Sequence, residues 1–341
     1  MWEGFFLEEK MKELLAQYPF EVRHLYRGRG AWIAETDEGL KMIRLYNGSP
    51  ERLRWEWMIK GELRERGCRY IDYIVSKNDG ELLVSDGDDE KYVVTDWFGG
   101  RECNMKDRQE VIQGVIHLAG IHKKMHSFLE NTLWKSISNK DNLQEEMQRR
   151  IRELKMIRNY SAHKKQKNDF DRKYLEVYGT YYADGCRAID ILRDMDYTML
   201  YQKCMDEKVL CHGDYNQHNL FIYKDSMALV HFDHMHCELQ VYDLYMFMRK
   251  VLEKNRWNVG LGTAMLDAYT RVLPLDYRQM RCFFSFMLFP EKFWKIVNRY
   301  QNTRKSWMSA QNMAKLDKLI LEQEAKNHFM IALDKYCEKN G

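Results

Sequence analysis

At 341 residues the chain exceeds the size at which a single hydrophobic core usually suffices, so we expect two lobes or domains. Its 54 basic and 51 acidic side chains leave a net charge of +3, which gives no support for a nucleic-acid partner. No segment approaches the roughly 18 apolar residues of a membrane span, and the N-terminus lacks the basic start of a secretion signal. The eight cysteines are scattered without a C-x-x-C pair, so we expect reduced thiols and a cytoplasmic protein.

The N-terminal part of the chain predicts a small antiparallel sheet with two helices. Ser49 and Pro50 favour the start of the second helix, and Gly67 favours its end near residue 66. Residues 95–100 have the composition of a hinge between lobes. The first helix is expected over residues 5–15, and the strands over 22–26, 31–36, 40–46, 82–84 and 92–95.

The remainder of the chain predicts mainly helices. Apolar residues recur at helical spacing over 109–128, a charged helix is expected over 142–155, and helix follows helix over 242–337. Two short strands, one ending at Cys211 and one over 220–223, flank the polar segment between them. The sequence therefore predicts an α+β fold with two lobes, a small antiparallel-sheet lobe over residues 1–98 and a larger helical lobe over residues 99–341.

The segment His212–Asn219 has the spacing H-x-D-x-x-x-x-N of a kinase catalytic loop. In such a loop an aspartate orients the acceptor hydroxyl and takes its proton, and an asparagine helps to bind the metal that bridges the phosphates. Asp214 and Asn219 fit these two roles. The flanking strands supply the expected context, whereas a polar surface turn is the simpler alternative.

A second segment, Val230–Asp233, follows at the place where a kinase needs a carboxylate for Mg²⁺. In the register that we favour, His231 occupies this position and Asp233 lies two residues further on. We expect both residues on one strand, where alternate side chains share a face, so that Asp233 approaches the cleft.

A nucleotide clamp is expected in the N-terminal lobe. Gly28 and Gly30 form a glycine-rich turn that lets backbone amides approach phosphates, although any hairpin turn can have this composition. A cation on the third strand must pair with a glutamate on the next helix. Arg44 and Lys41 compete for the first role on opposite faces of the strand, and we favour Arg44. For the second role we favour Glu56, with Glu62 as the fallback. The hinge residues Asp96 and Trp97 are further candidates for nucleotide contact.

With these motifs the chain resembles the aminoglycoside phosphotransferase and choline kinase superfamily, and within it the CotS family of bacterial spore coat proteins. The resemblance extends from about residue 22 to residue 300. It rests on the segments 210–219, 229–233 and 242–250, with support from 93–101 and 287–291. It implies a protein-kinase-like fold, ATP and Mg²⁺ as cofactors, and either a small-molecule acceptor or spore coat proteins as partners. It also implies that a cytoplasmic protein is assembled into the coat of a spore.

The chain departs from this family at the metal strand, which usually reads apolar-Asp-apolar-Asp, because His231 replaces the first aspartate. Imidazole is a poor ligand for Mg²⁺, which prefers oxygen atoms. Three readings follow. In the first, the protein is a spore coat component with a degraded or altered phosphotransferase site and weak or absent ATP and Mg²⁺ binding. In the second, it is an active ATP-dependent small-molecule kinase. In the third, the segment binds a softer metal such as Zn²⁺ through His231, Asp233, His234, His236 and Cys237.

Overall fold

The computed structural model describes residues 2–128, 142–302 and 307–340, which fall into two compact units. The first unit comprises the chain up to Asn104, a segment that starts at Ile121, and His212–His236. The second comprises Met105–Gly120, the described residues from 142 to Cys211, and the chain from Cys237 onward. The segment with the catalytic-loop motif thus belongs to the same unit as the N-terminal sheet, which a division between residues 98 and 99 does not capture.

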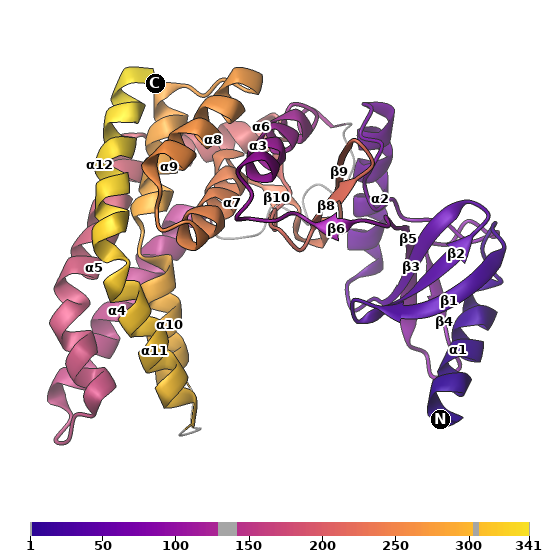
Figure 1. Ribbon diagram of the computed structural model, residues 1–341, viewed down its shortest axis with the longest axis horizontal. Coiled ribbons are helices and arrows are strands. Elements are labelled where there is room, and N and C mark those ends of the chain that lie inside the picture. The colour runs from indigo at the N-terminus through magenta and orange to yellow at the C-terminus, as the bar shows by residue number, and fades with distance from the viewer. Residues whose placement is uncertain (1, 129–141, 303–306, 341) are drawn as a thin grey trace. The chain divides into compact units, whose positions relative to one another are not determined.

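A five-stranded antiparallel sheet with the order β1-β2-β3-β5-β4 forms the main part of the first unit (Figure 1). Its strands alternate their side chains between two faces, and each face has its own hydrophobic cluster. The helix α1 (Trp2–Leu15) covers one face, where Leu14 packs with Ala34 and Ile43. The strands are β1 (Val22–Gly28), β2 (Ala31–Thr36), β3 (Gly39–Leu45), β4 (Leu83–Ser85) and β5 (Lys91–Asp96).

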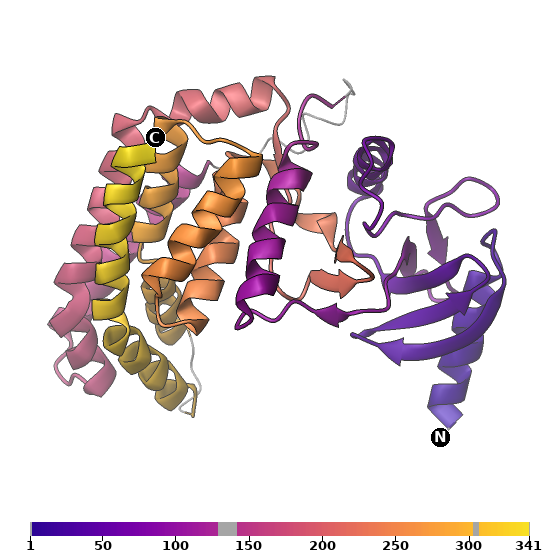
Figure 2. The same ribbon diagram turned by 45° about the horizontal axis from the view of Figure 1, so that its top comes forward.

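The other face of the sheet packs against a second, three-stranded sheet with the order β6-β8-β9 (Figure 2). Met42 of β3 shares a buried cluster with Phe221 and Val230, which lie on either side of the hairpin after the catalytic-loop motif. This packing fixes the motif beside the N-terminal sheet. The three strands are β6 (Arg101–Glu102), β8 (Leu220–Tyr223) and β9 (Ser226–Leu229).

The helix α2 (Pro50–Glu65) connects β3 to the rest of the first unit and begins where the sequence predicts. The Ser49 side chain accepts a hydrogen bond from the Arg52 backbone N–H, and Pro50 occupies the first turn, where its missing N–H costs nothing. After the helix ends, Gly67 adopts a positive φ of 84° and supports the predicted turn.

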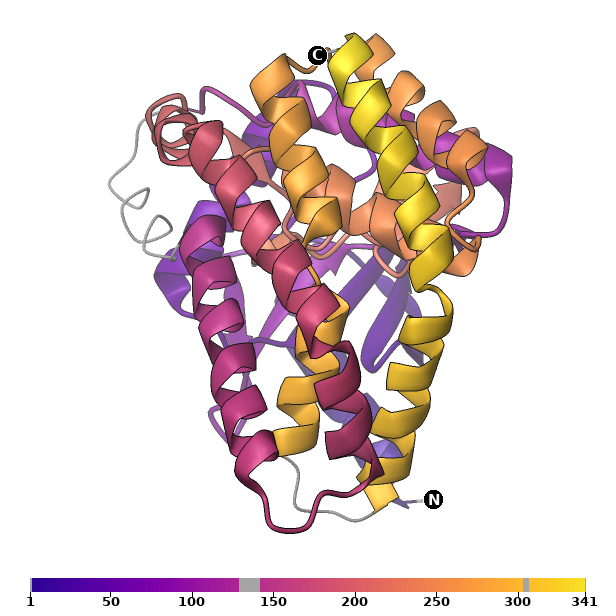
Figure 3. The ribbon, with the colours of Figure 1, turned by 90° about the vertical axis from the view of Figure 1, so that its left-hand side faces the viewer.

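The second unit is mainly helical, which confirms the predicted fold class. In Figure 3 the long helices α4 and α5 form an antiparallel pair, α9 lies beside α5, and α12 lies beside α9. A row of phenylalanines on α9, including Phe283 and Phe286, is fully buried. A two-stranded sheet joins β7 (Leu210–Cys211) to β10 (His236–Cys237). The helices are α3 (Arg108–His122), α4 (Leu143–His163), α5 (Asp169–Asp194), α6 (Tyr197–Asp206), α7 (Val241–Lys254), α8 (Val259–Val272), α9 (Tyr277–Leu288), α10 (Glu291–Gln301), α11 (Trp307–Leu321) and α12 (Gln323–Asn340).

Candidate active site

The catalytic-loop motif is held in place by its own histidine. The imidazole of His212 is fully buried, with Nε2 3.1 Å from the carbonyl oxygen of Val230 and Nδ1 3.3 Å from the backbone N of Asp214. The carbonyl accepts and the backbone N–H donates, so the neutral tautomer with the proton on Nε2 satisfies both contacts. Gly213 adopts a φ of 80°, and a Cβ atom there would lie 2.1 Å from the backbone oxygen of His234. Only glycine fits this position.

The structure brings Asp214 and Asn219 together. The amide nitrogen of Asn219 donates to the Oδ2 atom and to the backbone oxygen of Asp214, each at 2.9 Å. Asn216 also donates to the Asp214 backbone oxygen and accepts from the backbone N–H of His218. The hydrogen bond from Asn219 therefore fixes the orientation of the Asp214 carboxylate. Because the amide nitrogen of Asn219 is used in this way, its amide oxygen is the atom that could bind a hard cation.

The segment around His231 differs from the strand that we expected. The strand β9 ends at Leu229, and His231 has a left-handed backbone with a φ of 62°. Residues Phe232–His234 then form a single 3₁₀ turn, η2. The expectation that His231 and Asp233 share a strand face is therefore wrong, because the chain turns between them. The Oδ2 atom of Asp72 accepts the His231 N–H at 2.8 Å and holds this turn in place.

Asp233 is paired with a cation from the sheet. The Nη2 atom of Arg44 donates to Oδ1 of Asp233 at 2.7 Å, and Arg52 donates to the backbone oxygens of Asp233 and Met235. Burial opposes ionisation of Asp233, but the positive charges of Arg44 and Lys60 outweigh it and lower the pKa of the carboxyl. Burial also lowers the pKa of His231, so its imidazole is neutral at pH 7.

The two candidate cations of β3 lie on opposite faces of the strand, as the alternation of side chains predicts. Arg44 lies on the face of the catalytic-loop motif. Lys41 lies on the other face, where its Nζ atom is 2.7 Å from the Asp96 carboxylate and 5.7 Å from the centre of the Phe20 ring. Arg44, not Lys41, is the β3 cation that reaches the segment after β9.

The expected pair between a β3 cation and a glutamate of the next helix is not formed. The carboxylate of Glu56 lies 2.6 Å from Nζ of Lys60, one turn further along α2, and Lys60 lies 2.8 Å from the Asp72 carboxylate. These three side chains are almost completely buried. The fallback residue, Glu62, pairs with Arg66 at 3.0 Å. Sequence reasoning missed Lys60 and Asp72, because a lysine four residues after a glutamate usually marks a solvent-exposed helix face.

Arg29, which lies between Gly28 and Gly30 in the glycine-rich turn, contacts the catalytic loop. Arg29 and Gly30 both have positive φ values in the tight turn that joins β1 to β2, and Gly28 ends β1. The guanidinium of Arg29 donates to Glu102 at 2.8 Å and to the backbone oxygen of His218 at 3.3 Å. The tip of the turn therefore lies over the loop that carries Asp214.

At the hinge, the backbone N–H groups of Asp96 and Trp97 are both used within the protein. They donate to the carbonyl oxygens of Tyr73 and Leu40 at 2.8 and 2.9 Å. The indole ring of Trp97 is buried, with its centre 5.5 Å from that of Phe221 and 6.0 Å from that of His231. Trp97 therefore borders the candidate site with an aromatic surface rather than with a free donor from its backbone.

The donor atoms around η2 do not fit a conventional Mg²⁺ site. Mg²⁺ favours six oxygen ligands, whereas His231 offers a nitrogen atom and the Asp233 carboxylate already accepts from Arg44. The donor atoms do not fit a softer metal such as Zn²⁺ either. Within residues 2–128, 142–302 and 307–340, no three histidine, cysteine, aspartate or glutamate side chains are grouped so as to hold an ion. The structure therefore gives no support to the zinc reading.

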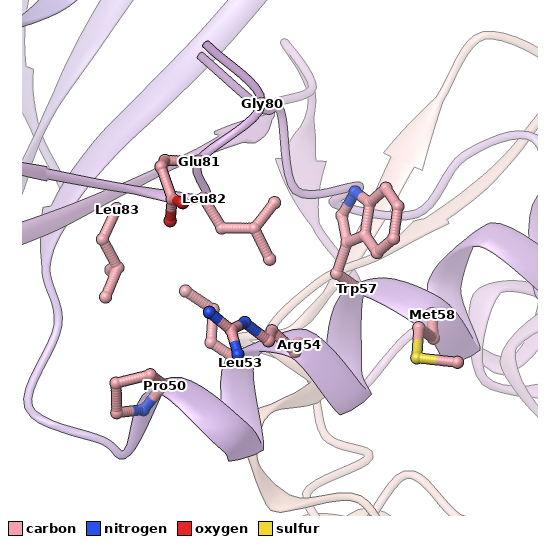
Figure 4. A pocket seen from close by; sticks show the side chains of 9 residues that line it. All are labelled: Pro50, Leu53, Arg54, Trp57, Met58, Gly80, Glu81, Leu82 and Leu83. Carbon is pink, nitrogen blue, oxygen red and sulfur yellow. The ribbon is translucent and has the colours of Figure 1, made fainter. Parts of the chain in front are cut away.

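A pocket of about 290 Å³ lies between α2 and the chain before β4 (Figure 4). Leu53 and Trp57 project from the helix, and Leu82 and Leu83 project from the chain segment across from it. The other lining residues are Pro50, Arg54, Met58, Gly80 and Glu81. It uses a different face of α2 from Arg52, Glu56 and Lys60, and none of the candidate site residues lines it.

Several solved structures share this fold, which is the fold of the aminoglycoside phosphotransferases. An aminoglycoside phosphotransferase from Alicyclobacillus acidocaldarius has a TM-score of 0.85 at 19% identity, with 96% of both chains covered. Spectinomycin phosphotransferase in complex with ADP and spectinomycin has a TM-score of 0.60 at 14% identity, over 96% of this chain and 98% of that one. Amicoumacin kinase in complex with AMP-PNP and Ca²⁺ has a TM-score of 0.59 at 13% identity, over 94% and 93%.

The family itself follows from the sequence match. Residues 11–333 match the family model described as "Spore coat putative kinase YutH", and the chain belongs to this family. Spore coat protein S of Bacillus subtilis is 23% identical over 339 residues, which cover 97% of this chain and 96% of that protein. Both the predicted superfamily and the predicted spore coat relationship are thus confirmed. No described helix combines the length and apolar character that a bilayer crossing requires.

Proposed function

We propose that the protein is a kinase-fold component of the spore coat whose phosphotransferase site is altered, so that phosphoryl transfer is weak or absent. The observation that carries the proposal is the pairing of Asp233 with Arg44 beside a neutral His231. In a kinase site this segment must offer carboxylate oxygens to a divalent ion. Here one oxygen ligand is replaced by imidazole and the other is neutralised by a guanidinium.

The location in the coat is supported by the family and by the relationship to Spore coat protein S. The protein would be made in the cytoplasm and would use its folded surface to bind other coat proteins. A tagged copy in its spore-forming host should be recovered with the coat fraction of mature spores. Recovery of the tagged protein only from the mother-cell cytoplasm would contradict this part of the proposal.

The second candidate is an active ATP-dependent kinase that phosphorylates a hydroxyl of a small molecule. The observation in its favour is the intact contact between Asn219 and Asp214. Asp214 would orient the acceptor hydroxyl and take its proton, and Arg44 would be the cation nearest the phosphates. The glycine-rich turn, with Gly28 and Gly30, and the hinge with Trp97 would border the nucleotide.

A transfer assay decides between the two. Purified protein is incubated with radiolabelled ATP, Mg²⁺ and a panel of aminoglycosides, choline and ethanolamine, with Asp214→Asn as the matched control. We expect wild type to release or transfer no more phosphate than Asp214→Asn, because the metal ligands are compromised. Turnover that Asp214→Asn abolishes would establish the active kinase instead.

A second variant tests the position assigned to His231. His231→Asp supplies an oxygen ligand, and we expect it to raise Mn²⁺ affinity about tenfold or more, since divalent affinity follows the charge and number of the ligands. The measurement is the paramagnetic effect of bound Mn²⁺ on water protons. Unchanged affinity would show that residue 231 does not occupy the metal position.

A further inference from the structure

The ion pairs around η2 show which carboxylates Lys60 and Arg44 contact. In the helix α2, Lys60 is completely buried and lies within 2.8 Å of the carboxylates of both Glu56 and Asp72. A buried carboxylate needs a cationic partner, and Glu56 has one from its own helix. Arg44 is therefore not required by the helix, and its guanidinium pairs with Asp233 instead.

The same segment receives a second guanidinium. Arg52 donates to the backbone oxygens of Asp233 and Met235, and its side chain stacks on Trp55 with 4.5 Å from its central carbon to the ring centre. Arg44 thus donates to the carboxylate of Asp233, and Arg52 donates to its backbone oxygen. The three cations Arg44, Arg52 and Lys60 are balanced by the carboxylates of Asp233, Glu56 and Asp72, and the Asp233 carboxylate that a divalent cation would need is already paired with Arg44.

The side chains of Arg44 and Asp233 are 19% and 36% exposed, so this ion pair is partly accessible from solvent. Guanidinium groups present planar donor pairs that match phosphate oxygens, and they stay charged at any physiological pH. Arg44 therefore has the chemistry, the charge and the access to contact a phosphate that approaches η2.

From this arrangement we infer that Arg44 takes the place of the divalent ion, so that the site binds the phosphates of a nucleotide without metal. This inference rests on the proposed function, because the kinase fold supplies the nucleotide as the ligand. Arg44 is then a binding residue whose positive charge keeps Asp233 from recruiting Mg²⁺. The nucleotide phosphates would compete with Asp233 for the guanidinium.

Binding measurements without any acceptor test this inference. ATP is titrated calorimetrically into the wild-type protein in excess Mg²⁺ and in EDTA, and we expect dissociation constants that agree within about threefold. If Mg²⁺ increased the affinity for ATP by about tenfold or more, the inference would be overturned. The absence of ATP binding in both conditions would also overturn it, while leaving the proposed lack of phosphoryl transfer intact.

The variant Arg44→Met provides the second measurement. Loss of a charged donor is expected to weaken ATP binding in EDTA by roughly 10- to 100-fold. Release of Asp233 is expected to raise Mn²⁺ affinity in the absence of nucleotide about tenfold. Arg54→Met, which removes an exposed guanidinium from α2, is the matched control and should change neither value. Unchanged Mn²⁺ affinity in Arg44→Met would contradict the inference.

Two more measurements separate the effect of the positive charge from that of the nucleotide. Arg44→Lys keeps the positive charge, so it should show the melting temperature of the wild-type protein and retain part of the metal-free ATP binding. Complete loss of ATP binding in a folded Arg44→Lys protein would count against electrostatic replacement of the metal.

Inorganic tripolyphosphate serves as a probe of the anion alone. If it binds as tightly as ATP, the assignment of a nucleotide as the ligand is wrong.

Discussion

Lys60 is a buried residue whose positive charge acts on the candidate site. Its ammonium group is completely buried, between Glu56 and Asp72, with the centre of the Phe232 ring 5.2 Å away. Burial lowers the pKa of Lys60, but the two carboxylates outweigh this effect and raise it overall. Since Asp72 also accepts the His231 N–H, Lys60 links α2 to the turn that follows β9.

The first prediction concerns this residue. Lys60→Met leaves two buried carboxylates without a cation, and we expect it to lower the free energy of unfolding by about 3–5 kcal/mol. Urea unfolding followed by circular dichroism measures the change. Arg54→Met, on an exposed position of the same helix, should stay within about 0.5 kcal/mol of wild type. If Lys60→Met were equally harmless, the buried cluster would not contribute to stability.

At the scale of elements, α2 determines the site more than any other segment. One face of the helix carries Arg52, Glu56 and Lys60 toward the chain around η2, and another face lines the pocket of Figure 4. The helix also follows β3 directly, so the strand that presents Arg44 and the helix that supports the turn are adjacent in sequence. A disturbance at the start of α2 is therefore expected to reach the site.

The N-cap of α2 provides the test. Ser49→Ala removes the acceptor for the Arg52 N–H, and we expect a loss of about 1 kcal/mol in the free energy of unfolding. Hydrogen exchange of the first turn of α2 should accelerate with it. Ser49→Asp keeps an acceptor at the cap and places a negative charge at the helix N-terminus, so it should match or exceed wild-type stability. Equal stability of all three proteins would show that the cap does not matter.

At the scale of the whole molecule, each compact unit has its own core, and the second unit contains an unusual buried acid. Glu238 is 4% exposed and accepts hydrogen bonds from the Tyr197 hydroxyl and from the Leu239 N–H. Burial raises the pKa of Glu238 to about 7, although the hydrogen bond from Tyr197 opposes the shift. The folded protein thus holds this proton more tightly than the unfolded chain does.

The sign of the pH dependence follows. Because the folded pKa of Glu238 exceeds the unfolded value, its protonated form stabilises the fold fully below about pH 4.5, and this contribution is lost as the pH rises through about 7. Glu238→Gln stays neutral and removes the dependence. Between pH 5 and pH 8, we expect the unfolding free energy of wild type to fall by up to about 3 kcal/mol relative to Glu238→Gln. Urea titrations at several pH values measure it, and parallel curves would contradict the prediction.

The sequence alone determined the features that depend on local chemistry. Ser49 and Pro50 marked the start of α2, and the alternation of side chains along β3 placed Arg44 and Lys41 on opposite faces. The spacing between Asp214 and Asn219 predicted a shared loop, and the two side chains are in contact. Such features were predictable because the residues involved are neighbours along one strand, helix turn or loop.

Only the tertiary structure decided the partners of the charged side chains. Arg44 is joined to Asp233 and Lys60 to Asp72, and no local pattern records pairs that are distant in sequence. The left-handed turn at His231, which replaced the expected strand, likewise depends on the Asp72 carboxylate that accepts its N–H. A charge in a partly buried site takes the nearest opposite charge that packing allows, and packing is a property of the folded chain.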